Sequence, residues 1–185
     1  YDPRFESDLT FIGGYWPYKA KVLDKWLLPL IPKYRVKLFG NSAWPTTSYC
    51  GHLQPQYTAT ALASAKICPN LHEPHSQVFG HDIIERPFKL LSNKCFVVSD
   101  YVEGLTKLFN QGEMVYAKTP DEFSNQIDYF LSHPKKRKSY IDAGYDSVIN
   151  GHTYFHRAID ILRNLGYEEL AEKGRKQYEV IKCQF

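Results

Sequence analysis

Short apolar runs alternate with helical patterns along the first 117 residues. The runs are bounded by Gly, Pro, Asn or Asp and predict buried strands: residues 9–14, 34–41, 65–70, 95–100 and 113–117. Helical segments are expected between them, at residues 19–30, 57–65, 87–92 and 102–109. This alternation predicts parallel strands joined by right-handed crossovers, which is a Rossmann-like α/β fold with helices flanking the sheet.

Only helices are predicted after residue 117. Thr119 and Glu122 form a capping box at the start of the first of these helices. Pro134 begins the second, Thr153 is expected to cap the third, and a final charged helix covers about residues 167–181. The chain is therefore expected to end in an all-helical stretch.

Length and composition predict a single domain. A chain of 185 residues with 43% hydrophobic residues can bury one core. We expect one Rossmann-like domain over residues 1–185, with strands and helices alternating over 1–117 and helices over 118–185. The chain begins with Tyr1 and enters a strand pattern within a few residues, so we expect it to be part of a longer, two-domain protein.

Charge and hydropathy disfavour two classes of partner. The net charge is only +3, and the basic run at residues 133–138 opens a predicted helix, so a solvated helix face is favoured over a nucleic-acid patch. There is no apolar stretch of the length that a membrane span needs, and no signal sequence. We expect a soluble, cytoplasmic protein that has no transmembrane segment and binds no nucleic acid.

The cysteines and histidines do not predict a metal site. No C-x-x-C spacing occurs, and Cys68 and Cys95 lie in apolar runs, where a thiol behaves as a small hydrophobic group. The segment His-Glu-Pro-His at residues 72–75 lacks the helical H-E-x-x-H spacing, and Pro74 indicates a loop. We assign no metal ligand.

The carboxyl ends of the predicted strands should meet around one crevice, where α/β sheets bind their ligands. The residues that follow these strands are Gly13, Gly14, Gly40, Asn41, Asn70 to Glu73 and Asp100 to Gly104. The Gly-Gly turn suits backbone contact with a phosphate, although such a turn also serves chain geometry alone. Neither G-x-G-x-x-G, a P-loop nor D-x-D occurs. A bound diphosphate would therefore have to be neutralised by protein cations and helix N-termini.

Three charged residues stand at the start of the helix predicted after Pro87. Arg86 and Lys89 would add positive charge beside the helix N-terminus, which favours a phosphate or diphosphate. Glu85 could accept two hydrogen bonds from a ribose diol. The alternative is that Glu85 caps the helix and the two cations form surface ion pairs worth less than about 1 kcal/mol.

The order of motifs along the chain resembles the C-terminal domain of CgeB-like glycosyltransferases of the group 1 superfamily. After the opening F-I-G-G-Y come N-x-H, E-R-x-F, a strand ending in S-D-Y, then G-L, L-x-H-P, A-G and H-T-Y-x-H-R. Together they span about residues 9–165.

The resemblance implies one half of a GT-B glycosyltransferase, the half that holds the nucleoside-diphosphate sugar. It implies that Arg86 and Lys89 are catalytic because they stabilise the leaving diphosphate. The donor-binding residues that it implies are Gly13, Gly14, Asn70, His72, Glu85, Asp100, Tyr101 and Gly104. No cofactor is expected besides the donor substrate, and catalysis is expected to be independent of a metal ion.

Two positions depart from the wider superfamily. The two glutamates of the E-x7-E pattern would fall on His81 and Lys89, so Glu85 becomes the better candidate for the ribose. A small-residue turn is replaced by Ser92, Asn93 and Lys94, where Asn93 is expected to adopt the left-handed conformation.

The function that follows is transfer of a sugar to an acceptor hydroxyl on a glycan, protein or lipid. The acceptor would be bound by an N-terminal domain of the same polypeptide, so this domain alone should bind donor without turnover. Two alternatives remain open. They are a non-catalytic Rossmann-like module that binds another ligand or a protein, and a GT-B-fold nucleotide-sugar epimerase.

Overall fold

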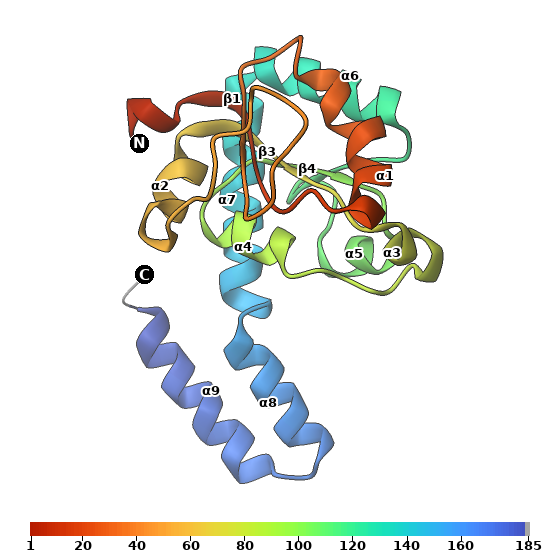
Figure 1. Ribbon diagram of the computed structural model, residues 1–185. Coiled ribbons are helices and arrows are strands. Elements are labelled where there is room, and N and C mark those ends of the chain that lie inside the picture. Colours follow the sequence, from red (N-terminus) through yellow and green to blue (C-terminus); the bar gives the residue numbers. More distant parts are fainter. Residues whose placement is uncertain (184–185) are drawn as a thin grey trace.

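The computed structural model describes residues 1–183 and contains one parallel sheet of five strands (Figure 1). The strands lie in the order β2-β1-β3-β4-β5. Their bounds are Ser7–Ile12 (β1), Val36–Phe39 (β2), Ala65–Asn70 (β3), Val97–Asp100 (β4) and Val115–Ala117 (β5). All four pairings are parallel. The predicted Rossmann-like fold is confirmed.

The helices follow the predicted alternation, with one addition. Their bounds are Pro17–Trp26 (α1), Thr58–Ala63 (α2), Pro74–Phe79 (α3), Arg86–Ser92 (α4), Glu103–Leu108 (α5), Pro120–Ser132 (α6), Pro134–Gly151 (α7), Tyr154–Asn164 (α8) and Glu168–Lys182 (α9), with short 3-10 turns at Pro3–Phe5, Leu28–Leu30 and Pro55–Tyr57. The loop predicted at Pro74 is wrong. Pro74 occupies the first turn of α3, where the missing N–H of proline costs nothing.

Two apolar layers hold the helices on opposite faces of the sheet. On one face α1 and α6 pack with Leu23 and Phe123 against Phe11 of β1. On the other face α2, α4, α5 and α7 pack around Leu91 and Val148. Each fully buried side chain of this size contributes about 1.5 to 3 kcal/mol. The helices are therefore fixed to the sheet by burial, and with them the loops at the strand ends.

The helix caps follow the sequence in part. Thr119 accepts a hydrogen bond from the amide of Glu122 (3.1 Å), as the capping box predicts. The Glu122 carboxylate accepts from the amide of Lys118 (2.7 Å) rather than from that of Thr119. At α8 the amide of Thr153 donates to Nδ1 of His156 (3.2 Å), so His156 supports the start of this helix.

The turn after α4 differs from the expectation. Asn93 has φ −93° and is not left-handed. Lys94 takes that conformation instead, with φ 54°. Its ammonium lies 4.4 Å from the centre of the Tyr145 ring, so a cation–π contact offsets part of the backbone strain. The choice between the two residues depends on a ring that lies about fifty positions further along the chain.

The C-terminal helices α8 and α9 pack on each other and stand away from the sheet (Figure 1). At the start of α7, Lys135, Lys136 and Lys138 are exposed, and Arg137 donates to the carbonyl of Leu131 at the end of α6 (3.2 Å). The basic run is thus a solvated helix face that also caps α6. None of the described helices is long and apolar enough to cross a membrane.

Candidate functional site

The candidate site lies where the chain leaves β1 and β3 in opposite directions. From β1 the chain crosses to β2 on one side, whereas β4 and β5 follow β3 on the other. Neighbouring strands whose connections diverge leave a crevice at their carboxyl ends, and α/β proteins bind ligands there. Gly13 follows the first of these strands, and the segment from Leu71 to Glu73 follows the second.

The glycine turn after β1 is packed closely against its surroundings. The amide of Gly13 donates to the carbonyl of Phe39 (2.8 Å). A Cβ on Gly13 would lie 2.8 Å from a ring atom of Phe11 and 3.0 Å from Nη2 of Arg86. Glycine is therefore required for the guanidinium to approach the turn. The N–H of Gly13 already donates to Phe39, so it does not donate to a phosphate. What Gly13 provides is space for the guanidinium of Arg86.

Arg86 reaches from the start of α4 toward the carboxyl ends of β1 and β3. Its Nη1 donates to the carbonyl of Leu71 (3.0 Å), and its guanidinium stacks 4.6 Å from the centre of the Phe11 ring. Burial lowers the pKa of Arg86 to about 10, and the charges of Asp100 and Glu73 oppose this shift. The side chain is thus a charged group held against the crevice. The alternative of a surface ion pair does not apply to it.

Lys19 is a second cation at the site, and the sequence analysis missed it. It is the third residue of α1, and its side chain is only 3% exposed. Its ammonium lies 6.0 Å from the centre of the same Phe11 ring and 3.9 Å from Oε1 of Glu73. Burial and the neighbouring Arg86 lower the pKa of Lys19 to about 8.

A signal for Lys19 was present in the sequence. It stands three and four positions before Val22 and Leu23, so it lies on the apolar side of the helix directly after the glycine turn. A lysine on a core-facing stripe is costly unless it has a partner or a function.

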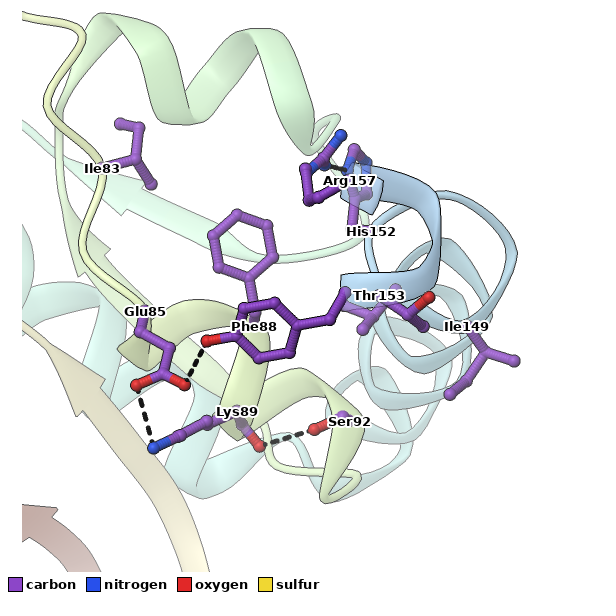
Figure 2. Close-up of a pocket in the computed structure, with 11 residues that line it drawn as sticks. Ile83, Glu85, Phe88, Lys89, Ser92, Ile149, His152, Thr153 and Arg157 are labelled. Atoms are coloured by element: carbon purple, nitrogen blue, oxygen red, sulfur yellow. Dashed lines mark hydrogen bonds and ion pairs between the residues drawn. The ribbon is translucent and has the colours of Figure 1, made fainter. Parts of the chain in front are cut away.

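Glu85 and Lys89 lie apart from Arg86. Nζ of Lys89 lies 2.9 Å from Oε2 of Glu85, and the other oxygen of that carboxylate accepts from the Tyr154 hydroxyl at 2.7 Å (Figure 2). Lys89 is 65% exposed. Of the two alternatives from the sequence, Lys89 follows the surface ion pair. Arg86 instead points toward the carboxyl ends of β1 and β3.

A pocket of about 420 Å³ lies on the Glu85–Lys89 side of α4 (Figure 2). Phe88 and Val148 contribute its apolar wall, and Glu85, Lys89 and Tyr154 lie along its rim. His152 is fixed there because its Nε2 donates to the carbonyl of Leu108 (3.1 Å) and Nδ1 accepts from Arg157 (2.6 Å). Burial and Arg157 lower the pKa of His152. A neutral, immobile imidazole results.

Three of the predicted donor-binding residues form a buried polar network behind the crevice. The carboxylate of Asp100 accepts from the amide of His72 (3.1 Å), from Nδ1 of His72 (2.8 Å) and from Nε2 of Gln77 (2.9 Å). Nδ2 of Asn70 donates to the hydroxyl of Ser99 (2.8 Å). Asn70, His72 and Asp100 are 0% exposed. They are thus positioned to support the crevice from within.

Tyr101 and Gly104 follow the carboxyl end of β4, Gly104 within the first turn of α5. The ring of Tyr101 is partly exposed and lies 5.0 Å from Nζ of Lys118. The amide of Gly104 donates to the carbonyl of Gly80 (2.5 Å), and a Cβ on Gly104 would lie 2.9 Å from that same oxygen. Gly104 therefore allows α5 to approach the loop that follows α3.

Among residues 1–183 no group of three or more His, Cys, Asp or Glu side chains could hold a metal ion. Nε2 of His75 is instead 2.8 Å from Oδ2 of Asp82. Cys68 and Cys95 are buried, as expected, and their mutual hydrogen bond and burial raise the pKa of the Cys68 thiol. The positive charge in the crevice comes from Lys19 and Arg86.

Solved structures share this fold at low sequence identity. T4 phage β-glucosyltransferase has 10% identity and a TM-score of 0.65, over 91% of this chain and 50% of that one. An α1,3-fucosyltransferase has 15% identity and a TM-score of 0.58, over 76% and 38%. Sucrose-phosphate synthase from Thermosynechococcus elongatus has 12% identity and a TM-score of 0.60, over 87% and 45%. These likenesses show the Rossmann-like fold of one half of a GT-B glycosyltransferase.

The chain spans half or less of the length of these structures. No curated protein sequence matches it significantly. Residues 20–163, which are most of the chain, match the family model described as glycosyl transferase-like. The chain therefore belongs to the glycosyl transferase-like family.

Proposed function

We propose that this domain binds the nucleoside-diphosphate sugar of a CgeB-like glycosyltransferase, which transfers the sugar to an acceptor hydroxyl. The observation that carries the proposal is the pair of cations, the buried Lys19 and the half-buried Arg86, that share the ring of Phe11 at the switch point of the sheet. Arg86 lowers the pKa of Lys19 by repulsion, which Glu73 and Asp100 oppose, and an anionic ligand would stabilise both cations further. A diphosphate fits this charge.

The proposed chemistry is electrostatic. When the bond from sugar to phosphate breaks, positive charge develops on the sugar and negative charge on the leaving diphosphate. Lys19 and Arg86 stabilise the negative charge, and burial strengthens this interaction because little water screens it. In such sites the loss of one donor typically costs about 3 to 4 kcal/mol of transition-state stabilisation. No metal ion is needed in this scheme.

The nucleoside half of the donor is proposed to occupy the pocket beside α4. Its volume of about 420 Å³ is within the usual range for small-molecule sites. Glu85 at the rim accepts hydrogen bonds from the ribose hydroxyls. To do so, its carboxylate gives up its present hydrogen bond from Tyr154 or its ion pair with Lys89. Lys89, once released from Glu85, adds a third positive charge toward the diphosphate.

The other predicted residues have supporting roles in this proposal. Gly13 gives Arg86 room beside the proposed diphosphate site, Gly14 lies against Trp16, and Tyr101 and Gly104 form the rim where the sugar lies. Asn70, His72 and Asp100 hold the segment from Leu71 to Glu73 in place, since Asp100 accepts from both the amide and the ring of His72.

A second domain is proposed to supply the acceptor site and the catalytic base. The matched structures are about twice as long as this chain. The helices α8 and α9 extend from the body with Ile161, Leu165 and Leu170 exposed, a surface suited to cover by another domain. The isolated domain is then expected to bind donor without turning it over, and the whole protein is expected to act in the cytoplasm.

Calorimetry tests donor binding directly. The chain is titrated with UDP, GDP, ADP and their sugars, and we expect one nucleotide series to bind. In R86M and K19M the affinity should fall by about ten- to a hundredfold, since a hydrogen bond to a charged group contributes about 1.5 to 3 kcal/mol. Lys176→Met on α9 is the matched control, because Lys176 is exposed and distant from the crevice. If no nucleotide binds, a non-catalytic module replaces the transferase.

The full-length protein separates the two enzymatic classes. Release of free nucleotide only when an acceptor is added supports a transferase. Interconversion of the nucleotide sugar without an acceptor would instead identify an epimerase.

A further inference from the structure

The indole of Trp16 is an exposed aromatic surface beside the buried side chain of Lys19. Trp16 is the N-cap residue of α1, and its ring centre lies 5.4 Å from Nζ of Lys19. The residue is 42% exposed. A large aromatic ring that is open to solvent can still bury apolar area when a ligand covers it. Trp16 therefore offers an apolar contact directly beside a cation of the proposed diphosphate site.

The indole is held in place by the glycine turn. A Cβ on Gly14 would lie 2.2 Å from Cζ3 and 2.4 Å from Cε3 of Trp16, so only glycine lets the ring rest against the backbone here. The amide of Tyr15 donates to the hydroxyl of Ser42 (2.7 Å), which fixes the turn itself. Because the ring is already packed on one side, a ligand that stacks on it pays little to order it.

Glu73 adds a carboxylate beside the same ammonium. Its Oε1 lies 3.9 Å from Nζ of Lys19, and its Oε2 lies 3.8 Å from Nδ1 of His75. Both separations exceed hydrogen-bond distance, and the Glu73 side chain is 23% exposed. A carboxylate has two acceptor oxygens and no donor. The oxygens of Glu73 can therefore still accept hydrogen bonds from ligand hydroxyls.

The chemistry of the donor gives its direction in the site. In a nucleoside-diphosphate sugar, the sugar is attached to the phosphate that is distant from the nucleoside. The nucleoside is proposed to lie beside α4, which begins at Arg86, so the distal phosphate would lie at Lys19. The sugar then comes next to Trp16 and Glu73. A sugar ring presents C–H groups on its faces and hydroxyls at its edge, which match an aromatic face and a carboxylate.

Building on the proposed function, we propose that Trp16 and Glu73 hold the sugar of the nucleoside-diphosphate sugar. One face of the sugar ring stacks on the indole, and hydroxyls at the ring edge donate to the carboxylate of Glu73. Tyr101 and Gly104 remain the outer rim of this subsite. Trp16 and Glu73 are then specificity-determining residues for the sugar, whereas Lys19 and Arg86 bind the diphosphate that every donor shares.

Calorimetry separates the sugar from the nucleotide. The chain is titrated with UDP-glucose and UDP, GDP-mannose and GDP, and ADP-glucose and ADP, and the series that binds is used for the variants. W16A should bind the nucleotide sugar about threefold to tenfold more weakly, with less than about a twofold change for the nucleoside diphosphate. W16F should keep most of the affinity because it keeps an aromatic face. Y167A is the control, since Tyr167 is exposed at the turn between α8 and α9.

E73Q should change the two affinities in different directions. The variant removes a negative charge beside Lys19, so electrostatics alone would strengthen the binding of both anionic ligands. We expect the nucleoside diphosphate to bind at least as tightly as it does to the unchanged chain. The nucleotide sugar should instead bind about threefold more weakly, because a neutral amide is a poorer partner for sugar hydroxyls than a carboxylate. Stronger binding of both ligands would remove Glu73 from the sugar subsite.

Tryptophan fluorescence of the unchanged chain gives a readout that does not depend on how variants fold. Trp16 is exposed, whereas Trp26 is half-buried and Trp44 is buried. The emission should therefore shift to shorter wavelength on saturation with the nucleotide sugar, and W16F should lose this shift. An unshifted emission, or an equal change for both ligands in W16A, overturns the inference. Absence of any nucleotide-sugar binding contradicts the proposed function instead.

Discussion

The ammonium of Lys19 is buried beside Arg86, and this setting lowers its pKa to about 8. Donor affinity should therefore weaken as pH rises through about 8, because the free protein loses the charge that the diphosphate needs. In K19R the affinity should stay constant over this interval, since arginine does not titrate there. Calorimetric titrations between about pH 7 and about pH 9.5 measure the effect. A K19R profile that falls in parallel with the unchanged protein would contradict this assignment.

Lys19 also affects stability, with a defined sign. Its pKa is lower in the folded chain than the ordinary 10.5, so the folded state disfavours the charged form. This penalty is fully present below pH 8 and disappears as pH rises toward the unfolded value. K19M should therefore raise the free energy of unfolding at pH 7 by about 0.5 to 2 kcal/mol while it lowers donor affinity by about ten- to a hundredfold. Urea unfolding checks this, and a destabilised K19M would show that the lysine serves folding.

At the scale of elements, helix α6 depends on its N-cap. Thr119 accepts from the amide of Glu122, and the helix carries Phe123 and Ile127 into the core. T119A should lower the free energy of unfolding by about 0.5 to 2 kcal/mol, because it leaves a helix amide without its partner. T119S keeps the oxygen and is the matched control. Equal urea midpoints for T119A and the unchanged chain would show that the cap is not needed.

Helix α4 presents two chemically different sides. Arg86 turns toward Phe11 and Gly13, and Glu85 and Lys89 face the pocket shared with α8. Adjacent positions at the start of one helix thus serve the crevice and the pocket separately. In the proposed function this helix aligns the diphosphate with the nucleoside of one donor.

At the scale of the whole molecule, the exposed apolar residues Ile161 of α8 and Leu165 directly after it predict a domain contact. Ile161 is 59% exposed and Leu165 is 65% exposed, so replacing both with serine should leave the isolated chain's melting temperature nearly unchanged. In the full-length protein the same double variant should separate one cooperative thermal transition into two, because the proposed second domain loses its contact. Calorimetric unfolding of both forms tests this. A single, unshifted transition in the full-length variant would place the second domain elsewhere.

Much of the fold could be predicted from local patterns. The five strands and most helices were found because apolar periodicity and turn residues act over a few positions, as at Thr119 and Pro134. Helix α3 was missed because it is short and Pro74 suits both a loop and a first turn. Lys94 was missed because its conformation is supported by Tyr145, which approaches it only in the folded chain.

The sequence by itself determined the Rossmann-like order of elements and the edge of the sheet at which a ligand crevice is expected, because parallel strands bring their carboxyl ends to one edge whichever side chains they carry. Only the tertiary structure decided which cations reach that crevice. Arg86 enters it, Lys89 pairs with Glu85, and Lys19 joins from another helix. The physical reason is that burial and side-chain direction depend on packing between segments far apart in the chain.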